Sequence, residues 1–191
     1  GAGDFMFSGW DGPPLRTYYS IPDAVTATTP VLIVMHGVRR DADRYRDEWR
    51  TLAQRGDLIV MAPQFVASDF PGTAGYNGGN FENSRGRPLP RPQWSFAAIE
   101  PLFDDIRRRT GTQVPSYAIY GHSAGAQFVH RFVLFIPEAR YHQAIAANAG
   151  WYTLPDFALA FPYGLRGAPV DGTSVRAALE RPLTILLGTA D

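Results

Sequence analysis

The stretch that decides the fold reads Tyr117-Ala118-Ile119-Tyr120-Gly121-His122-Ser123-Ala124-Gly125. Its first part is a short apolar run that stops at a glycine, which is typical of a buried strand. The residues that follow, 124–136, are apolar nearly all round and stop before Pro137, which is typical of a buried helix. The sequence therefore predicts a strand, a sharp turn around Ser123 and a central helix.

Apolar runs and helical periods alternate along the rest of the chain. Two helices are predicted from apolar residues on one helical face, Tyr45, Trp49, Leu52 and Ala53 before Gly56, and Phe96, Ile99, Phe103 and Ile106 before Gly111. Runs without polar alternation predict buried strands at 31–35, 58–62, 144–147 and 183–187, and residues 17–21 predict an antiparallel edge strand. This order predicts a single α/β domain over residues 1–191, with a mostly parallel sheet flanked by helices on both faces.

The composition favours a globular protein that binds a small molecule. Of the 191 residues 45% are hydrophobic, and 18 Lys plus Arg balance 18 Asp plus Glu. This balance argues against nucleic acid or an anionic membrane as the main partner, and no run approaches the roughly 20 apolar residues of a membrane span. The sequence has no cysteine, no metal-ligand cluster and no phosphate-binding loop, so we expect no cofactor. The compartment stays open, although a start at Gly1 without a leader fits an exported, processed protein.

Two long segments, 63–92 and 155–172, are rich in Gly and Pro and predict loops. Each follows a predicted strand, which is where α/β sheets build their sites. We therefore expect a functional site beside these loops.

Residues 121–125 match the pattern G-x-S-x-G in the context that a nucleophilic serine requires, between a strand and a helix. The tight turn strains the serine backbone and crowds its neighbours, so Gly121 and Gly125 have to lack side chains. The N-terminus of the helix stabilises negative charge that develops near Ser123. We expect Ser123 to be a nucleophile, with a strand-to-helix turn that carries no chemistry as the alternative.

A serine that takes part in acyl transfer also needs backbone N–H donors for the oxyanion. The residue after the nucleophile, Ala124, is predicted to supply one of them. We assign the second to Val38, in the His-Gly loop that follows the predicted strand at 31–35. His36 in the same loop is expected to buttress it rather than to react.

Three segments together resemble an α/β-hydrolase of the polyhydroxybutyrate-depolymerase-like esterase group: the strand and His-Gly loop at 31–38, the turn at 121–125, and the late strand leading to Gly188-Thr189-Ala190-Asp191. The resemblance implies the α/β-hydrolase fold and a catalytic triad in the chain order serine, acid, histidine. Asp191 matches the acid, and Asp171 is a weaker competitor. Secreted depolymerases of the group usually carry a cysteine where this chain has Val38, which favours a small ester over a polymer as the substrate.

All four histidines precede Asp191, and their positions argue against each as the base. His122 points away on the tight turn, and His130 lies on the order of 10 Å along the helix from the serine. His142 belongs at the amino end of the sheet, and His36 belongs to the oxyanion loop. We therefore expect the catalytic histidine after Asp191, so that the fold is incomplete at the C-terminus of these residues.

The predicted pocket has six candidate lining residues, His36, Arg39, Asn77, Asn80, Trp94 and Trp151. Arg39 and Arg40 flank the oxyanion loop and either attract an anionic ester or are simply solvated. The sequence predicts a serine esterase that cleaves a small-molecule carboxylic ester through an acyl-enzyme on Ser123. A peptidase or amidase of the same fold and a non-catalytic binding module are the alternatives, and the oligomeric state is not predicted.

Overall fold

A computed structural model describes residues 1–56 and 58–189 and contains a 7-stranded sheet in the order β1-β2-β4-β3-β5-β6-β7. The strands are β1 (Ala2–Phe7), β2 (Leu15–Ser20), β3 (Val31–Met35), β4 (Ile59–Gln64), β5 (Tyr117–His122), β6 (Tyr141–Ala147) and β7 (Leu183–Leu186). β4, β3, β5, β6 and β7 pair in parallel, whereas β2 is antiparallel to β4 and β1 is antiparallel to β2. The predicted mostly parallel sheet is confirmed.

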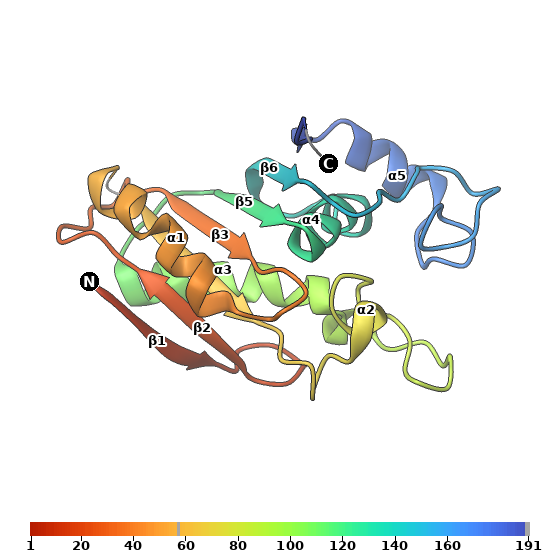
Figure 1. Ribbon diagram of the computed structural model, residues 1–191, viewed down its shortest axis with the longest axis horizontal. Coiled ribbons are helices and arrows are strands. Elements are labelled where there is room, and N and C mark those ends of the chain that lie inside the picture. Colours follow the sequence, from red (N-terminus) through yellow and green to blue (C-terminus); the bar gives the residue numbers. More distant parts are fainter. Residues whose placement is uncertain (57, 190–191) are drawn as a thin grey trace.

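Helices cover both faces of this sheet, as predicted (Figure 1). They are α1 (Ala42–Arg55), α2 (Gly72–Gly75), α3 (Ile99–Thr110), α4 (Ala124–Phe135) and α5 (Gly172–Leu179), with 3-10 turns η1 (Arg91–Gln93) and η2 (Ser95–Ala98) before α3. α1 packs on one face against Leu32, Val34 and Val60. The larger core lies on the opposite face, between the sheet and α3, α4 and α5.

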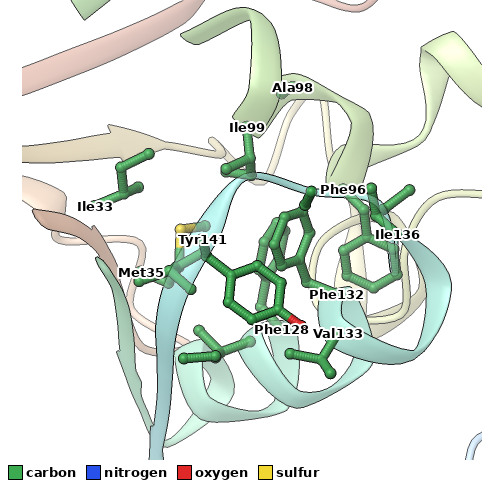
Figure 2. Packing of buried hydrophobic residues seen from close by; sticks show 14 of the residues in the cluster. Ile33, Met35, Phe96, Ala98, Ile99, Phe128, Phe132, Val133, Ile136 and Tyr141 are labelled. Carbon is green, nitrogen blue, oxygen red and sulfur yellow. The ribbon is translucent and has the colours of Figure 1, made fainter. Parts of the chain in front are cut away.

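The helix after the serine turn, α4, lies at the centre of that larger core. Every residue of α4 is buried, which agrees with the apolar pattern predicted for it. The Phe128 ring lies 4.9 Å from Phe96 and 6.3 Å from Phe132, centroid to centroid. Figure 2 shows these rings packed together between α4 and the strand that carries Tyr141, with Phe128 and Phe132 stacked and Phe96 edge-on to both. The packing holds the first turn of α4, and therefore Ser123, in a fixed place against the sheet.

Two local predictions were wrong. The run at 17–21 is an antiparallel strand, as expected, but β1 pairs outside it and forms the sheet edge. β1 contains two strand-favouring residues, Phe5 and Phe7, but also Gly3 and Asp4, so its propensity indicates a strand only weakly, and pairing with β2 adds to it. In α1 the side chain of Leu52 is 53% exposed, although it lies on the predicted apolar face, and Tyr45 and Ala53 make the contact with the sheet instead.

The two long loops differ in how they pack. Segment 63–92 begins as the end of β4, contains α2 and buries Phe65, Phe70 and Tyr76 completely, so much of it belongs to the core. Segment 155–172 runs over the surface until α5 begins. None of the helices within the described ranges is both long enough and apolar enough to cross a bilayer.

Substitution of Phe128 and Leu52 tests whether the first side chain belongs to the core and the second does not, as their exposure indicates. We expect Phe128→Ala to lower the free energy of unfolding by about 3–5 kcal/mol, because it removes a ring from a packed aromatic cluster. Leu52→Ala should cost less than about 0.5 kcal/mol, because solvent already reaches that side chain. Urea unfolding of both variants measures this, and a loss at Leu52 as large as at Phe128 would contradict the observed packing of α1.

Candidate active site

Ser123 is the single residue between β5 and α4, and its backbone has a strained conformation, with φ 57° and ψ −120°. Such a conformation costs a residue other than glycine on the order of 1–3 kcal/mol. Neighbouring backbone groups hold it, since the Ser123 N–H donates to the Ala147 carbonyl (3.0 Å) and the Ser123 carbonyl accepts from the Gln127 N–H (3.1 Å). The serine thus lies at the carboxyl end of the sheet and at the N-terminus of α4.

Gly121 and Gly125 allow backbone contacts that a side chain would block. A Cβ at Gly121 would overlap the Gly125 carbonyl, and a Cβ at Gly125 would overlap the carbonyl of Met35 at the end of β3. Backbone atoms cannot move aside as the end of a flexible side chain can. Both glycines are therefore needed for steric reasons.

The loop after β3 lies beside the serine, because Val38 and Ser123 line the same two cavities. A turn closed by the Arg40 N–H on the Gly37 carbonyl (3.2 Å) shapes this loop. Within the described residues, no hydrogen bond uses the N–H of Val38. The N–H of Ala124 starts a helix and has no intrahelical acceptor. Both predicted oxyanion donors thus lie next to the serine, and their role stays a prediction.

Arg40 fastens this loop to segment 63–92. Its guanidinium donates to the carbonyls of Phe65 (2.6 Å), Phe70 (3.1 Å) and Gly72 (2.9 Å), and it lies 4.4 Å over the Tyr76 ring. The interpretation of Arg40 as a solvated surface cation is therefore wrong. Its backbone has a positive φ of 63°, so the residue needs these contacts to hold a strained turn.

His36 lies beneath the loop and supports it from inside. Its Nδ1–H donates to the Gly37 carbonyl (2.9 Å), its Nε2 accepts from the Phe65 N–H (3.0 Å), and its ring stacks on Tyr76 at 4.5 Å. Burial lowers the pKa of His36 to about 3, so the ring is neutral at pH 7. With both nitrogens occupied, His36 has no free group to accept a proton from Ser123.

Two cavities open on either side of the serine, one toward α1 and one toward segment 63–92. The helix-side cavity, of about 350 Å³, is lined by Gly37, Val38, Arg39, Asp41, Arg44, Tyr45, Glu48, Tyr120, His122 and Ser123. The loop-side cavity, of about 420 Å³, is lined by Val38, Arg40, Ala67, Gly72, Thr73, Tyr76, Asn77, Ser123, Ala124, Gln127, Gly150 and Trp151. Both volumes suit a small organic group on each side of a scissile bond.

The two cavities differ in charge. In the helix-side cavity Arg44 pairs with Glu48 (2.9 Å) and Asp41 (3.8 Å), whereas exposed Arg39 takes part in no ion pair of the described residues. The loop-side cavity has Arg40 among its lining residues and no carboxylate. An electron-rich group is therefore more favourable on the loop side than a cation.

Three of the residues predicted to line the pocket do so. Arg39 lines the helix-side cavity, and Asn77 and Trp151 line the loop-side cavity. Asn77 is buried, with 4% of its surface exposed, and it comes from the long segment that the sequence predicts to lie near the site.

His36, Asn80 and Trp94 line neither cavity, so their prediction as pocket residues is corrected. The Trp94 indole N–H donates to the Leu89 carbonyl (3.0 Å), and the Asn80 side-chain amide donates to the Gln93 carbonyl at 3.4 Å. Both side chains stabilise the inner packing of their own segment. The reason is that this segment folds into the core and presents only part of its length to the serine.

Sequence reasoning missed two buried polar residues of α4, Gln127 and Arg131. Gln127 is 5% exposed and lines the loop-side cavity one helical turn after the serine. Arg131 is fully buried and donates to Thr153 Oγ1 (2.9 Å) and to the Asn77 carbonyl (2.8 Å), and burial lowers its pKa to about 10. Polar residues within an otherwise apolar helix are the signal that marks this network in the sequence.

His130, also on α4, is committed to structure. Its Nδ1–H donates to the Ala126 carbonyl (3.0 Å), and its Nε2 accepts from the Thr153 N–H (2.9 Å). Burial lowers the pKa of His130 to about 3. His130 therefore stays neutral and has no free ring nitrogen.

The remaining histidines lie at opposite ends of the sheet. His142 is exposed near the amino end of β6, where Ser116 Oγ lies 3.1 Å from its Nδ1. His122 lines the helix-side cavity as the last residue of β5. No hydrogen bond within residues 1–56 and 58–189 joins a histidine to the Ser123 hydroxyl.

Asp191, the predicted acid, lies outside the described residues. The loop that leads to it is attached to β6, since the Gly188 N–H donates to Asn148 Oδ1 (2.7 Å). Asp171, the competing candidate, is the N-cap of α5, where its carboxylate accepts from the Ser174 N–H (2.8 Å) and this bond lowers its pKa. Over the described part of the chain, no three metal-ligating side chains form a cluster.

The steric role of Gly125 predicts a specific loss of stability. We expect Gly125→Ala to lower the free energy of unfolding by about 1–3 kcal/mol, because the added methyl group has to displace the backbone at the end of β3. Gly172→Ala is the matched control, since a Cβ there meets nothing within 4 Å. Urea unfolding measures both, and equal losses would show that Gly125 is not under steric constraint.

The two buried histidines predict a loss of stability in acid. Their pKa is about 3 in the native state and 6.5 in the unfolded chain, so between these values the unfolded state binds more protons. Stability therefore rises with pH in this window, and lowering the pH from 7 to 5 should cost about 2 kcal/mol per histidine.

His36→Gln tests this assignment by removing one of the two groups. The decrease in the free energy of unfolding between pH 7 and pH 5 should become about 2 kcal/mol smaller than in the wild type. Urea unfolding at both pH values measures the difference, whatever the variant costs at pH 7. An identical pH dependence in the two proteins would mean that His36 is not buried in its neutral form.

Among the solved structures similar to this chain, two match nearly its whole length with high identity. Poly(aspartic acid) hydrolase-1 from Sphingomonas sp. KT-1 is 56% identical, with a TM-score of 0.97 over 100% of this chain and 72% of that chain. LpqC, a poly(3-hydroxybutyrate) depolymerase from Bordetella parapertussis, is 35% identical, with a TM-score of 0.91 over 99% of this chain and 66% of that chain. The Staphylococcus aureus fluorophosphonate-binding serine hydrolase FphF, 16% identical with a TM-score of 0.66 over 99% of this chain and 79% of that chain, shares the fold.

Comparison with protein-family models gave no match, and neither did comparison with curated proteins. The solved structures nevertheless establish the family, because the first match is 56% identical and this chain covers 72% of its length. The sheet, the strained serine and the two crowded glycines agree with it. The chain belongs to the α/β-hydrolase superfamily, in the polyhydroxybutyrate-depolymerase-like group.

Proposed function

We propose that this chain is a serine hydrolase that cleaves carboxylic esters through an acyl-enzyme on Ser123. One observation supports the proposal: Ser123 lies on a strained turn between two cavities, beside the backbone N–H groups of Val38 and Ala124, which donate to no acceptor within the described residues. In a turn without chemistry, a strained non-glycine residue has no evident advantage. The hydrolases among the structural matches support the same reaction class.

The proposed reaction begins when the Ser123 hydroxyl oxygen attacks the acyl carbon of an ester. The carbonyl oxygen becomes negatively charged, and the N–H groups of Ala124 and Val38 donate to it. The N-terminus of α4 lowers the energy of the same charge. Collapse of the intermediate releases the alcohol and leaves the acyl group on Ser123, and water then releases the acid.

The proton has to leave Ser123 through a base, and we infer that none of the four histidines of this chain supplies it. His122 lines the helix-side cavity with Ser123 but forms no hydrogen bond with its hydroxyl within the described residues. His36 and His130 have both ring nitrogens in hydrogen bonds to the backbone. His142 lies at the opposite end of β6. We therefore propose that the base is a histidine that follows Asp191, and that Asp191 orients it.

Amide hydrolysis is the second candidate, and one observation favours it. The 56% identical structure is a poly(aspartic acid) hydrolase, whose substrate is a polyamide that carries carboxylates. Exposed Arg39, at the rim of the helix-side cavity, forms no ion pair within the described residues and offers a contact to such an anion. The serine chemistry is the same for both bonds, so the leaving group and the charge of the substrate distinguish the two candidates.

A substrate panel on the native gene product tests the proposal. We expect faster turnover of p-nitrophenyl butyrate than of a dipeptide p-nitroanilide, and covalent labelling of Ser123 by a fluorophosphonate. Ser123→Ala should abolish the labelling and lower kcat/KM for the ester by at least about a thousandfold, since the nucleophile is lost.

Each other outcome has a definite meaning. Faster turnover of the anilide would replace the ester by the amide as the substrate class. Turnover that persists in Ser123→Ala would remove the serine from the mechanism. A native protein that neither hydrolyses any substrate nor takes the label would be a binding module with the hydrolase fold.

A further inference from the structure

The loop-side cavity contains a hydrogen-bond donor that the proposed reaction does not use. Gln127 is 5% exposed and lines this cavity together with Ser123 and Ala124. Its Oε1 accepts from Asn77 Nδ2, so its Nε2 is the free end of the amide. Within the described residues no acceptor is paired with this Nε2. Nε2 is not among the fully buried atoms that lack a partner, so it reaches the open space of the cavity, where a ligand or water can accept its hydrogen bond.

Neighbouring groups fix the direction of this donor. The Nε2 would lie 3.3 Å from a Cβ at Gly150, so the absence of a side chain there keeps the space beside it open. Asn77, which holds the other end of the amide, is held in turn by Arg131 through its carbonyl (2.8 Å). Arg131 is anchored on Thr153 (2.9 Å). The donor is thus preorganised by a chain of hydrogen bonds that reaches through the core.

The charge around the cavity favours an electron-rich ligand. Arg40 lines it directly, and the lining includes no carboxylate. Arg131 lies behind Asn77 without an ion pair among the described residues, and its Nη2 is buried without a hydrogen-bond partner. Two guanidinium groups therefore add positive potential at the side where Gln127 Nε2 is free.

The same cavity is the one suited to the acyl half of a substrate. Both predicted oxyanion donors, Val38 and Ala124, line it together with Ser123, whereas Ala124 is absent from the helix-side lining. The acyl group stays attached to the serine while its oxygen stays on these donors. The acyl group therefore has to occupy the loop-side cavity, which both Val38 and Ala124 line.

We propose that Gln127 is a specificity residue, whose Nε2 donates to a second oxygen of the acyl group. The preferred substrates are then acyl groups that carry a further carbonyl, hydroxyl or carboxylate oxygen, rather than plain alkanoyl chains. Gln127 lies one turn of α4 after Ser123, about 6 Å along the helix axis, so this oxygen lies a few bonds from the scissile carbon. The inference rests on the proposed function of Ser123 as the nucleophile.

Matched substrates test the inference on the native protein. p-Nitrophenyl 4-oxopentanoate and p-nitrophenyl pentanoate have equal chain lengths and differ in one carbonyl. We expect the wild type to prefer the oxo ester, and Gln127→Met, which keeps the length of the side chain, to lower the ratio of the two kcat/KM values about tenfold. Gln113→Met is the control, because Gln113 is exposed and lies after α3, away from the site.

The outcomes separate the inference from the proposed function. Equal turnover of the two esters by the wild type would overturn the inference, as would a Gln127→Met variant that loses activity on both esters to the same extent. If no ester is hydrolysed at all, the proposed function fails, and calorimetric Kd values for 4-oxopentanoate and pentanoate decide the inference alone. A preference for the oxo acid that Gln127→Met removes supports it, and equal affinities overturn it.

Discussion

The end of β3 and the first turn of α4 meet backbone to backbone, because Gly125 has no side chain to separate it from the Met35 carbonyl. β3 and β5 pair in parallel, with Met35 opposite Gly121, so both strands end at the same edge of the sheet. The two segments that carry the serine and the predicted oxyanion loop are thereby placed side by side. A contact between backbones fixes distances more firmly than a contact between flexible side chains, and the geometry of the site depends on it.

Polar side chains hold the segments around this contact in place, and their hydrogen-bond partners are uncharged backbone and hydroxyl groups. His36 and Arg40 attach the oxyanion loop to segment 63–92 by donating to, or accepting from, backbone groups. Arg131 similarly donates to a hydroxyl and a carbonyl. Neither arginine forms an ion pair within the described residues, so its charge is not cancelled nearby. The result is a region that holds its loops in place and favours negative charge, as the proposed acyl-transfer intermediate requires.

The two cavities beside Ser123 have different chemistry, which suits the two halves of a scissile bond. The helix-side cavity contains paired carboxylates and guanidinium groups, and it resembles an exposed polar surface. The loop-side cavity contains two aromatic rings, the side-chain amides of Asn77 and Gln127, and no carboxylate. In the proposed reaction, selectivity for the acyl group would depend on the long segment 63–92 and on α4, whereas the leaving group would meet α1. Because Gln127 lines the loop-side cavity, its proposed role concerns the acyl group and not the leaving group.

Much of the fold and the core of the candidate site could be predicted from the sequence, because their causes are local. The turn at Ser123 follows from a strand, two glycines and a helix that are adjacent in the chain, and apolar runs place the parallel strands. Predictions failed where the cause is a contact between distant segments. The edge position of β1 follows from its pairing with β2, and the exposure of Leu52 depends on which residues of α1 pack on the sheet.

The sequence by itself determined the turn at Ser123, the parallel sheet and the absence of cysteine chemistry. Only the tertiary structure decided which polar residues surround that turn. Asn77 meets Gln127 across 50 residues, and Arg40 reaches carbonyls 25–32 residues away. Periodicity and propensity describe neighbours along the chain, whereas these contacts depend on how the loop packs on the helix after both have formed.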